Sequence, residues 1–179
     1  QDEADKIDWR ELVRNSKAGQ MVLTNGPYLE VSTDQDNLAG ADIRAAGGEV
    51  TLNVKVQCTD WIDIDRVQIL VNGHQSKKLN FTRKNNEQMF KDGVVKFNET
   101  LTVKLSQDSH LIVVAYGENF NLQKGYGSST QSSMNPCAYN NPIFVDVDGG
   151  GFKASGDTLG FPLPVQGLTC LLYTSPSPR

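Results

Sequence analysis

Two neighbouring segments between Glu49 and Gly73 constrain the fold of this chain more than any other part of it. In the first, residues 50–58, an apolar side chain stands at every even position and a polar one at nearly every odd position. That period of two is typical of a β-strand with one buried face. The second, residues 67–71, repeats the pattern and runs into Asn72-Gly73, which supply the positive φ angles of a tight hairpin turn. The sequence therefore predicts two core strands, the second turning back through a hairpin.

The rest of the chain reads mainly as further short strands. Apolar runs predict strands at 94–105, 110–116 and 141–146, the middle one buried on both faces. Turn residues recur roughly every eight to twelve positions, which is typical of an antiparallel sandwich. We therefore expect a mainly β fold, an antiparallel immunoglobulin-like β-sandwich. The Asn-, Ser- and Gly-rich segment 117–141 is longer than an ordinary connection, and we expect either a binding loop or a partly disordered excursion.

The N-terminal segment has a different character. Residues 8–16 predict a short amphipathic helix with Asp8 as its N-cap, and extended pieces follow at 20–24 and 28–31. These residues contain too few apolar side chains to form a domain. We interpret residues 1–31 as the end of an upstream catalytic domain or as a strap across the following one, residues 32–48 as a linker, and residues 49–169 as the sandwich.

The last ten residues, 170–179, do not continue the composition before them. The run CLLYTSPSPR matches the in-frame translation of a transposase-type sequencing adapter, so we expect an artefact there and set it aside from structural argument. The chain begins Gln-Asp-Glu without a methionine, and we expect that part of the protein precedes it.

Charge and hydropathy exclude two classes of partner. The chain has 17 Lys and Arg against 21 Asp and Glu, a net charge of -4, and its basic residues are scattered. A nucleic-acid partner is therefore not expected, because such proteins concentrate positive charge on one face. No apolar run approaches the roughly 20 residues of a membrane span, so none is expected.

Short motifs in a fixed order resemble one family. Residues 11–14 (ELVR) followed by 19–27 (GQMVLTNGP) resemble a segment near the C-terminal side of PHP-type metal-dependent hydrolases, in particular the CehA/McbA-like group. Residues 70–73 (LVNG) and 141–149 (NPIFVDVDG) resemble the β-domain attached to such proteins, notably in planctomycete-like sequences. The resemblance covers nearly all of residues 9–165.

The resemblance implies a parent enzyme with a distorted α/β barrel. In that family, His-rich motifs and Asp residues hold divalent metals (zinc, manganese or iron), which hydrolyse phosphoester or related bonds. Metal-activated water needs several such ligands around an open position. This chain has only His74 and His110, with no His-x-His and no Ser-Asp-x-His motif. The resemblance therefore implies that the catalytic barrel lay upstream, and no catalytic or cofactor-binding residue can be carried over.

One loop has the outline of a calcium site. Asp146, Asp148 and Asp157 stand at positions 1, 3 and 12 of a Gly-rich loop, with Gly151 at position 6. Calcium prefers oxygen ligands around a sharp turn. Position 5 is a glycine, position 12 is Asp rather than Glu, and no helix flanks the loop. The alternative is a turn in which Asp side chains cap backbone amides.

Aromatic and cysteine residues leave several interpretations open. Trp61, among Asp60, Asp63 and Asp65, can bind a sugar or a cation, but more commonly such a Trp caps the end of a sandwich while the Asp residues face water. Four aromatic residues in and beside the long segment can form a carbohydrate platform or can fasten the loop to the sheet: Tyr116, Phe120, Tyr126 and Tyr139. We interpret Cys58 as a buried thiol; a disulfide between Cys58 and Cys137 stays open.

Two functional hypotheses follow. The first is the non-catalytic C-terminal fragment of a PHP-type hydrolase, which packs on the missing catalytic domain. The second is a free-standing secreted module that binds carbohydrate or a cell-surface polymer. Both favour a periplasmic or extracellular location. The arrangement of residues 9–27 discriminates between them, since an exposed apolar face there implies a missing partner.

Overall fold

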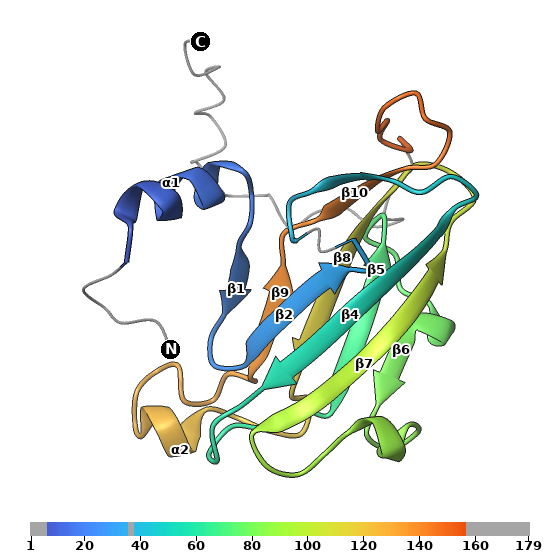
Figure 1. Cartoon of the computed structure of the whole chain (residues 1–179). Helices are drawn as coiled ribbons and strands as arrows, with labels where there is room; N and C mark the ends of the chain where they lie inside the picture. The colour runs from blue at the N-terminus through green and yellow to red at the C-terminus, as the bar shows by residue number, and fades with distance from the viewer. Residues whose placement is uncertain (1–6, 36–37, 157–179) are drawn as a thin grey trace.

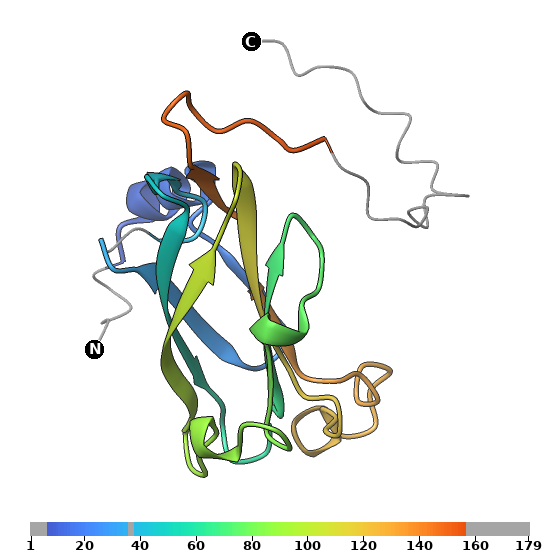
Figure 2. The ribbon, with the colours of Figure 1, turned by 90° about the vertical axis from the view of Figure 1, so that its right-hand side faces the viewer.

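Two β-sheets packed face to face make up the body of the protein, with a short helix standing outside them (Figures 1 and 2). The computed structural model describes residues 7–35 and 38–156. This confirms the mainly β sandwich expected from the sequence. The helices and strands are α1 (Trp9–Lys17), β1 (Val22–Thr24), β2 (Tyr28–Thr33), β3 (Asp42–Arg44), β4 (Glu49–Gln57), β5 (Arg66–Val71), β6 (Asn80–Thr82), β7 (Val95–Lys104), β8 (Ser109–Tyr116), α2 (Gln123–Tyr126), β9 (Cys137–Asn140) and β10 (Ile143–Asp146).

The larger sheet is built around β8. This strand pairs antiparallel with β5 along one edge, and with β9 and β10 in succession along the other. The sheet then extends through β6 beyond β5, through β1 beyond β9, and through β3, which runs parallel to β10. The smaller sheet has the order β2-β4-β7 and is entirely antiparallel. The chain crosses between the sheets from β4 to β5 and from β7 to β8.

The alternating pattern of the first core segment places its apolar side chains between the sheets. The even-numbered residues of β4 are at most 3 % exposed, and Leu52 and Val56 are fully buried. Val67 and Ile69 of β5 are fully buried from the opposite sheet. Phe97 of β7 fills the space near one end of this core, where its ring lies 5.2 Å from that of Phe90. The period of two in the sequence therefore identified the core correctly.

The predicted hairpin forms as expected. Asn72 has φ 53° and Gly73 has φ 78°, and His74 pairs back onto Val71.

A less regular feature occurs in β7, where Lys96 is an extra residue between the two pairs that β7 makes with the end of β4. Such a β-bulge redirects side chains. Here it turns Lys96 inward, where the side chain is only 9 % exposed.

The sandwich begins earlier in the chain than the sequence indicated. β2 pairs with β4 over six residues and buries Leu29 and Val31, so it belongs to the smaller sheet. β1 pairs with β9, and β3, in the expected linker, pairs with β10. Residues 22–44 therefore supply strands to the sandwich, and of the elements before β4 only α1 stands outside the two sheets. No helix among residues 7–35 and 38–156 is long and apolar enough to cross a membrane.

One further expectation needs correction. β8 is central, but it is not buried on both faces: its inward residues are buried, whereas the outward ones, such as Ile112 and Val114, are partly exposed. The long segment 117–141, for which a binding loop and a partly disordered excursion were the two expectations, contains α2 and β9, which the sequence pattern did not indicate. Asn25 fastens it, because its side chain donates to the Asn135 carbonyl (2.9 Å) and accepts from the Cys137 amide (2.7 Å).

Candidate functional site

The Gly-rich loop after β10 brings together two of the three Asp residues proposed for calcium, and adds one that the sequence analysis missed. Asp108, Asp146 and Asp148 each place a carboxylate oxygen within 4.8 Å of the others. Asp157 lies outside the described residues. Asp108 precedes β8 and reaches the loop because β8 and β10 are paired. Its separation of 38 residues from Asp146 left no local pattern to reveal it.

The three carboxylates are engaged with backbone amides. Asp146 accepts from the amides of Gly149 and Gly151, and Asp148 accepts from that of Gly150. Asp108 accepts from the amides of Val147 and Lys153, both at 2.9 Å, and these bonds lower the pKa of its carboxyl.

This geometry fits the capped turn that the sequence analysis kept as the alternative. The Lys153 ammonium adds a positive charge 3.9 Å from Asp148. Calcium binding stays a prediction, and calorimetric titration of the chain with calcium chloride tests it.

Asp60 is exposed, as the interpretation favoured from the sequence expected, but Asp63 and Asp65 are engaged by the protein. Asp63 is 23 % exposed and lies between the Arg83 guanidinium (3.0 Å) and the Lys96 ammonium (3.5 Å). Asp65 accepts from the Glu118 amide (2.7 Å). Both carboxylates therefore fix the end of the sandwich rather than present charge to a ligand.

Trp61 is 50 % exposed and packs on Gly125 of α2, where a Cβ atom would stand only 2.9 Å from the indole ring.

Both described cysteines are free. Burial, with a contribution from nearby Asp63, raises the pKa of the Cys58 thiol to about 11. Cys58 is thus the buried structural thiol that the sequence indicated.

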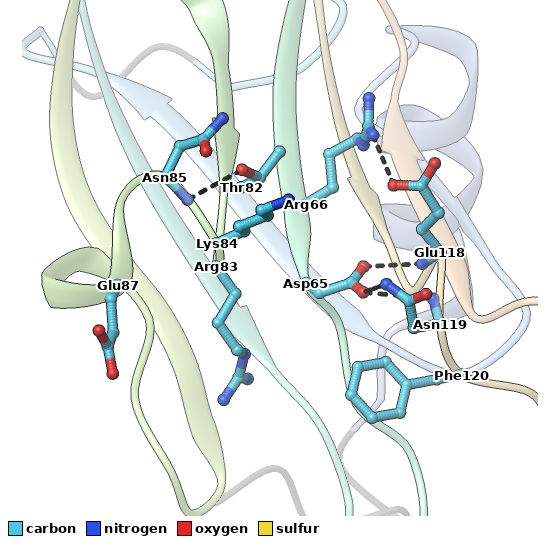
Figure 3. Close-up of a pocket in the computed structure, with 10 residues that line it drawn as sticks. All are labelled: Asp65, Arg66, Thr82, Arg83, Lys84, Asn85, Glu87, Glu118, Asn119 and Phe120. Carbon is cyan, nitrogen blue, oxygen red and sulfur yellow. Dashed lines mark hydrogen bonds and ion pairs between the residues drawn. The ribbon is translucent and has the colours of Figure 1, made fainter.

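A polar groove opens between the turn after β6 and the turn after β8 (Figure 3). It has a volume of about 610 Å³, within the usual range of small-molecule sites. Its floor is the start of β5. We call it the polar groove; it is lined by Asp65, Arg66, Thr82, Arg83, Lys84, Asn85, Glu87, Glu118, Asn119 and Phe120.

The N-terminal segment forms a second surface of note. Of fourteen large hydrophobic side chains that are exposed in the described part of the chain, nine lie between residues 7 and 38. Part of this set lines an open groove of about 390 Å³ between β1 and β2, the edge strands of the two sheets. We call the set the N-terminal apolar surface; it consists of Ile7, Trp9, Leu12, Val13, Met21, Val22, Leu23, Tyr28 and Leu38.

Helix α1 carries the most exposed part of this surface. Its apolar residues Trp9, Leu12 and Val13 are 63 %, 55 % and 44 % exposed, and the helix buries no side chain. Its C-terminal end is nevertheless fixed to the sandwich. Asn141 donates to the Gly19 carbonyl (3.0 Å), and Gly40 packs so closely that a Cβ atom there would meet the same carbonyl at 2.5 Å. The helix is therefore anchored at one end, while its apolar face stays largely exposed, with the Arg10 guanidinium 4.8 Å from the centre of the Trp9 ring.

Comparison of the chain with protein-family models, curated proteins and solved structures found no match. The described residues also do not fit the His-rich metal site that the hydrolase resemblance implies. Neither His74 nor His110 belongs to a group of three or more metal-ligating side chains within residues 7–35 and 38–156.

Proposed function

We propose that this chain is the non-catalytic β-sandwich end of a larger PHP-type metal-dependent hydrolase, and that it packs on the catalytic domain through the N-terminal apolar surface. The observation that carries the proposal is the concentration of exposed apolar side chains on α1 and the adjoining edge strands. Large exposed apolar patches mark interaction sites in soluble proteins, whereas single exposed apolar residues need no explanation.

The short length of α1 also supports docking on another domain. An isolated helix shorter than about 12–15 residues is marginal in water, and helices in proteins depend on packing of an apolar face. α1 has nine residues and buries none of them. Covering what remains exposed of Trp9, Leu12 and Val13 would contribute roughly 2–4 kcal/mol. A covalently linked catalytic domain would supply that cover without the full entropy cost of association.

The hydrolase assignment rests on the sequence resemblance. The segments that carry it, residues 11–14 and 19–27, are α1 and the entry to the sandwich, which is where a preceding domain would connect. Because the described residues do not form the family's metal site, the divalent metal and the hydrolysis of phosphoester or related bonds belong to the proposed catalytic domain. We expect this module to be inactive alone.

One observation favours the alternative, a free-standing secreted module that binds carbohydrate or a surface polymer. β1 and β2 complete the two sheets, so the sandwich has its own continuous core. A module with a complete core can fold without a neighbouring domain. A periplasmic or extracellular location suits either proposal.

Sequencing the source DNA upstream of Gln1, followed by hydrogen exchange on the longer protein, tests the proposal. We expect an in-frame region with His-x-His and Ser-Asp-x-His motifs. We also expect the amides of α1 to exchange at least about tenfold more slowly in the longer protein than in this chain, with β4 as an unchanged control. A secretion signal directly before Gln1 without such motifs, or equal exchange of α1 in both proteins, would overturn it.

A further inference from the structure

The polar groove has walls that are fixed before any ligand arrives. On one side, Asp65 accepts from the backbone amide and the side-chain amide of Asn119 (3.2 and 2.6 Å). Asn135 supports the same turn from behind by donating to the carbonyls of Gly117, Glu118 and Phe120. Preorganised walls reduce the entropy that a ligand must overcome on binding.

The other wall is equally constrained. The Thr82 amide donates to the Asn86 side chain (3.2 Å), and the Asn85 amide donates to the Thr82 hydroxyl (3.2 Å). The Arg83 backbone amide donates to the Asp65 carbonyl (2.8 Å), which ties this wall to the floor. The groove is therefore a fixed feature of the sandwich end rather than a gap between loose turns.

Most charges in the groove are already paired. Arg66 forms an ion pair with Glu118, and Arg83 forms ion pairs with Asp63 and Asp92. The ten lining residues include three cations and three carboxylates, so the groove has no net charge to attract a strongly charged ligand.

Three polar groups on the wall after β6 remain free. The Lys84 ammonium, the Asn85 side-chain amide and the Glu87 carboxylate are exposed and make no hydrogen bond or ion pair with any residue that the structure describes. Together they offer both donors and acceptors. The half-buried Phe120 ring lies across the groove from them, at its lower right end in Figure 3.

This combination selects a ligand class. A ligand without net charge that both donates and accepts hydrogen bonds, and that has an apolar face for an aromatic ring, satisfies all of these groups together. A saccharide has hydroxyl groups of this kind and C–H faces that pack on aromatic rings. We propose that the polar groove binds an uncharged saccharide chain.

The position of the groove keeps it open when the module is attached to another domain. α1 and the turns that form the groove lie at opposite ends of the sandwich in both views (Figures 1 and 2). A domain docked on α1 would leave the groove exposed. The inference therefore does not depend on the hydrolase proposal, and it holds equally for a free-standing module.

Nuclear magnetic resonance titration of the chain tests the site directly. The probes are cellohexaose, xylohexaose and maltohexaose, with sodium sulfate as an anion control. We expect one of the hexaoses to shift the amide signals of residues 82–87 and 118–120 saturably. Asn85→Ala and Glu87→Ala should each weaken that binding about tenfold. Asn98→Ala, which removes another exposed side-chain amide, from β7, should leave it unchanged.

Three results would overturn the inference. In the first, no hexaose gives saturable shifts at the groove. In the second, the shifts occur at Trp61 and Tyr126, which would place saccharide binding on the neighbouring exposed aromatics. In the third, sulfate shifts the groove signals and the sugars do not, which would identify an anion site. None of these results bears on the docking of α1, so failure of one proposal leaves the other intact.

Discussion

The matched substitutions Leu12→Ala and Leu52→Ala compare how much the apolar face of α1 and the core each contribute to the stability of the fold. Both remove the same atoms, but Leu12 is 55 % exposed and Leu52 is fully buried. Truncation of a buried leucine costs about 3–5 kcal/mol, since it combines lost transfer free energy with the cavity left behind. Leu12→Ala should change the free energy of unfolding by less than about 0.5 kcal/mol, because it leaves no cavity and alanine is an excellent helix former.

Urea denaturation followed by circular dichroism measures both effects. With a slope of about 1–3 kcal/mol per molar urea, Leu52→Ala should lower the unfolding midpoint by roughly 1–5 M, whereas Leu12→Ala should shift it by less than about 0.5 M. Measurement at two protein concentrations controls for self-association through α1, because only an associating chain has a concentration-dependent midpoint. A loss above about 1.5 kcal/mol for Leu12→Ala at both concentrations would show that α1 packs on its own sandwich and would contradict docking of α1 on another domain.

Three further predictions concern the sandwich. Gly48→Ala should destabilise the fold far more than Gly47→Ala in thermal unfolding: both residues have positive φ, but a Cβ atom at Gly48 would stand 1.9 Å from the Leu105 carbonyl oxygen, whereas one at Gly47 meets nothing within 4 Å. Cys58 should resist iodoacetamide at pH 8 in the native protein and react once urea unfolds it, because burial raises the pKa of its thiol to about 11; rapid native labelling, mapped by peptide mass spectrometry, would contradict this. The hydrogen bonds that lower the pKa of Asp108 stabilise the fold above the ordinary carboxyl pKa of about 4, and that contribution is lost as pH falls through the lowered pKa. Asp108→Asn should therefore weaken the dependence of the unfolding midpoint on acid pH. An unchanged dependence would exclude this role of Asp108.

Local patterns predicted those parts of the fold that local forces determine. The alternation in β4 corresponds to a fully formed strand, and Asn72-Gly73 forms the turn because these two residue types tolerate positive φ. β9 was missed because its four residues, Cys137–Asn140, carry no apolar alternation of their own. Pairing with β8 and β1 defines that strand, and such contacts join residues far apart in the sequence.

The candidate sites show the same limit. Asp146 and Asp148 could be identified from their spacing, but Asp108 joins them only through the pairing of β8 with β10. The polar groove has no motif at all, since its walls come from turns after β6 and β8 that lie more than thirty residues apart. Asp63 was expected to face water because a Trp with neighbouring Asp residues more commonly caps the end of a sandwich. The bulge that turns Lys96 inward supplies the opposing charge, and a two-residue period does not predict a bulge.

The comparison of α1 with β4 explains why periodicity alone could not assign a function. Both segments are amphipathic, and in each case the pattern indicates that one face will leave water. For β4 the covering surface is the opposite sheet of the same chain, so the fold alone accounts for the pattern. For α1 the apolar face remains exposed although its C-terminal end is fixed by Asn141 and Gly40. A helix anchored in this way presents its face in a defined direction, which a docking surface requires and a frayed terminus lacks. The pattern in the sequence predicts burial, and the structure shows that the described residues do not provide it.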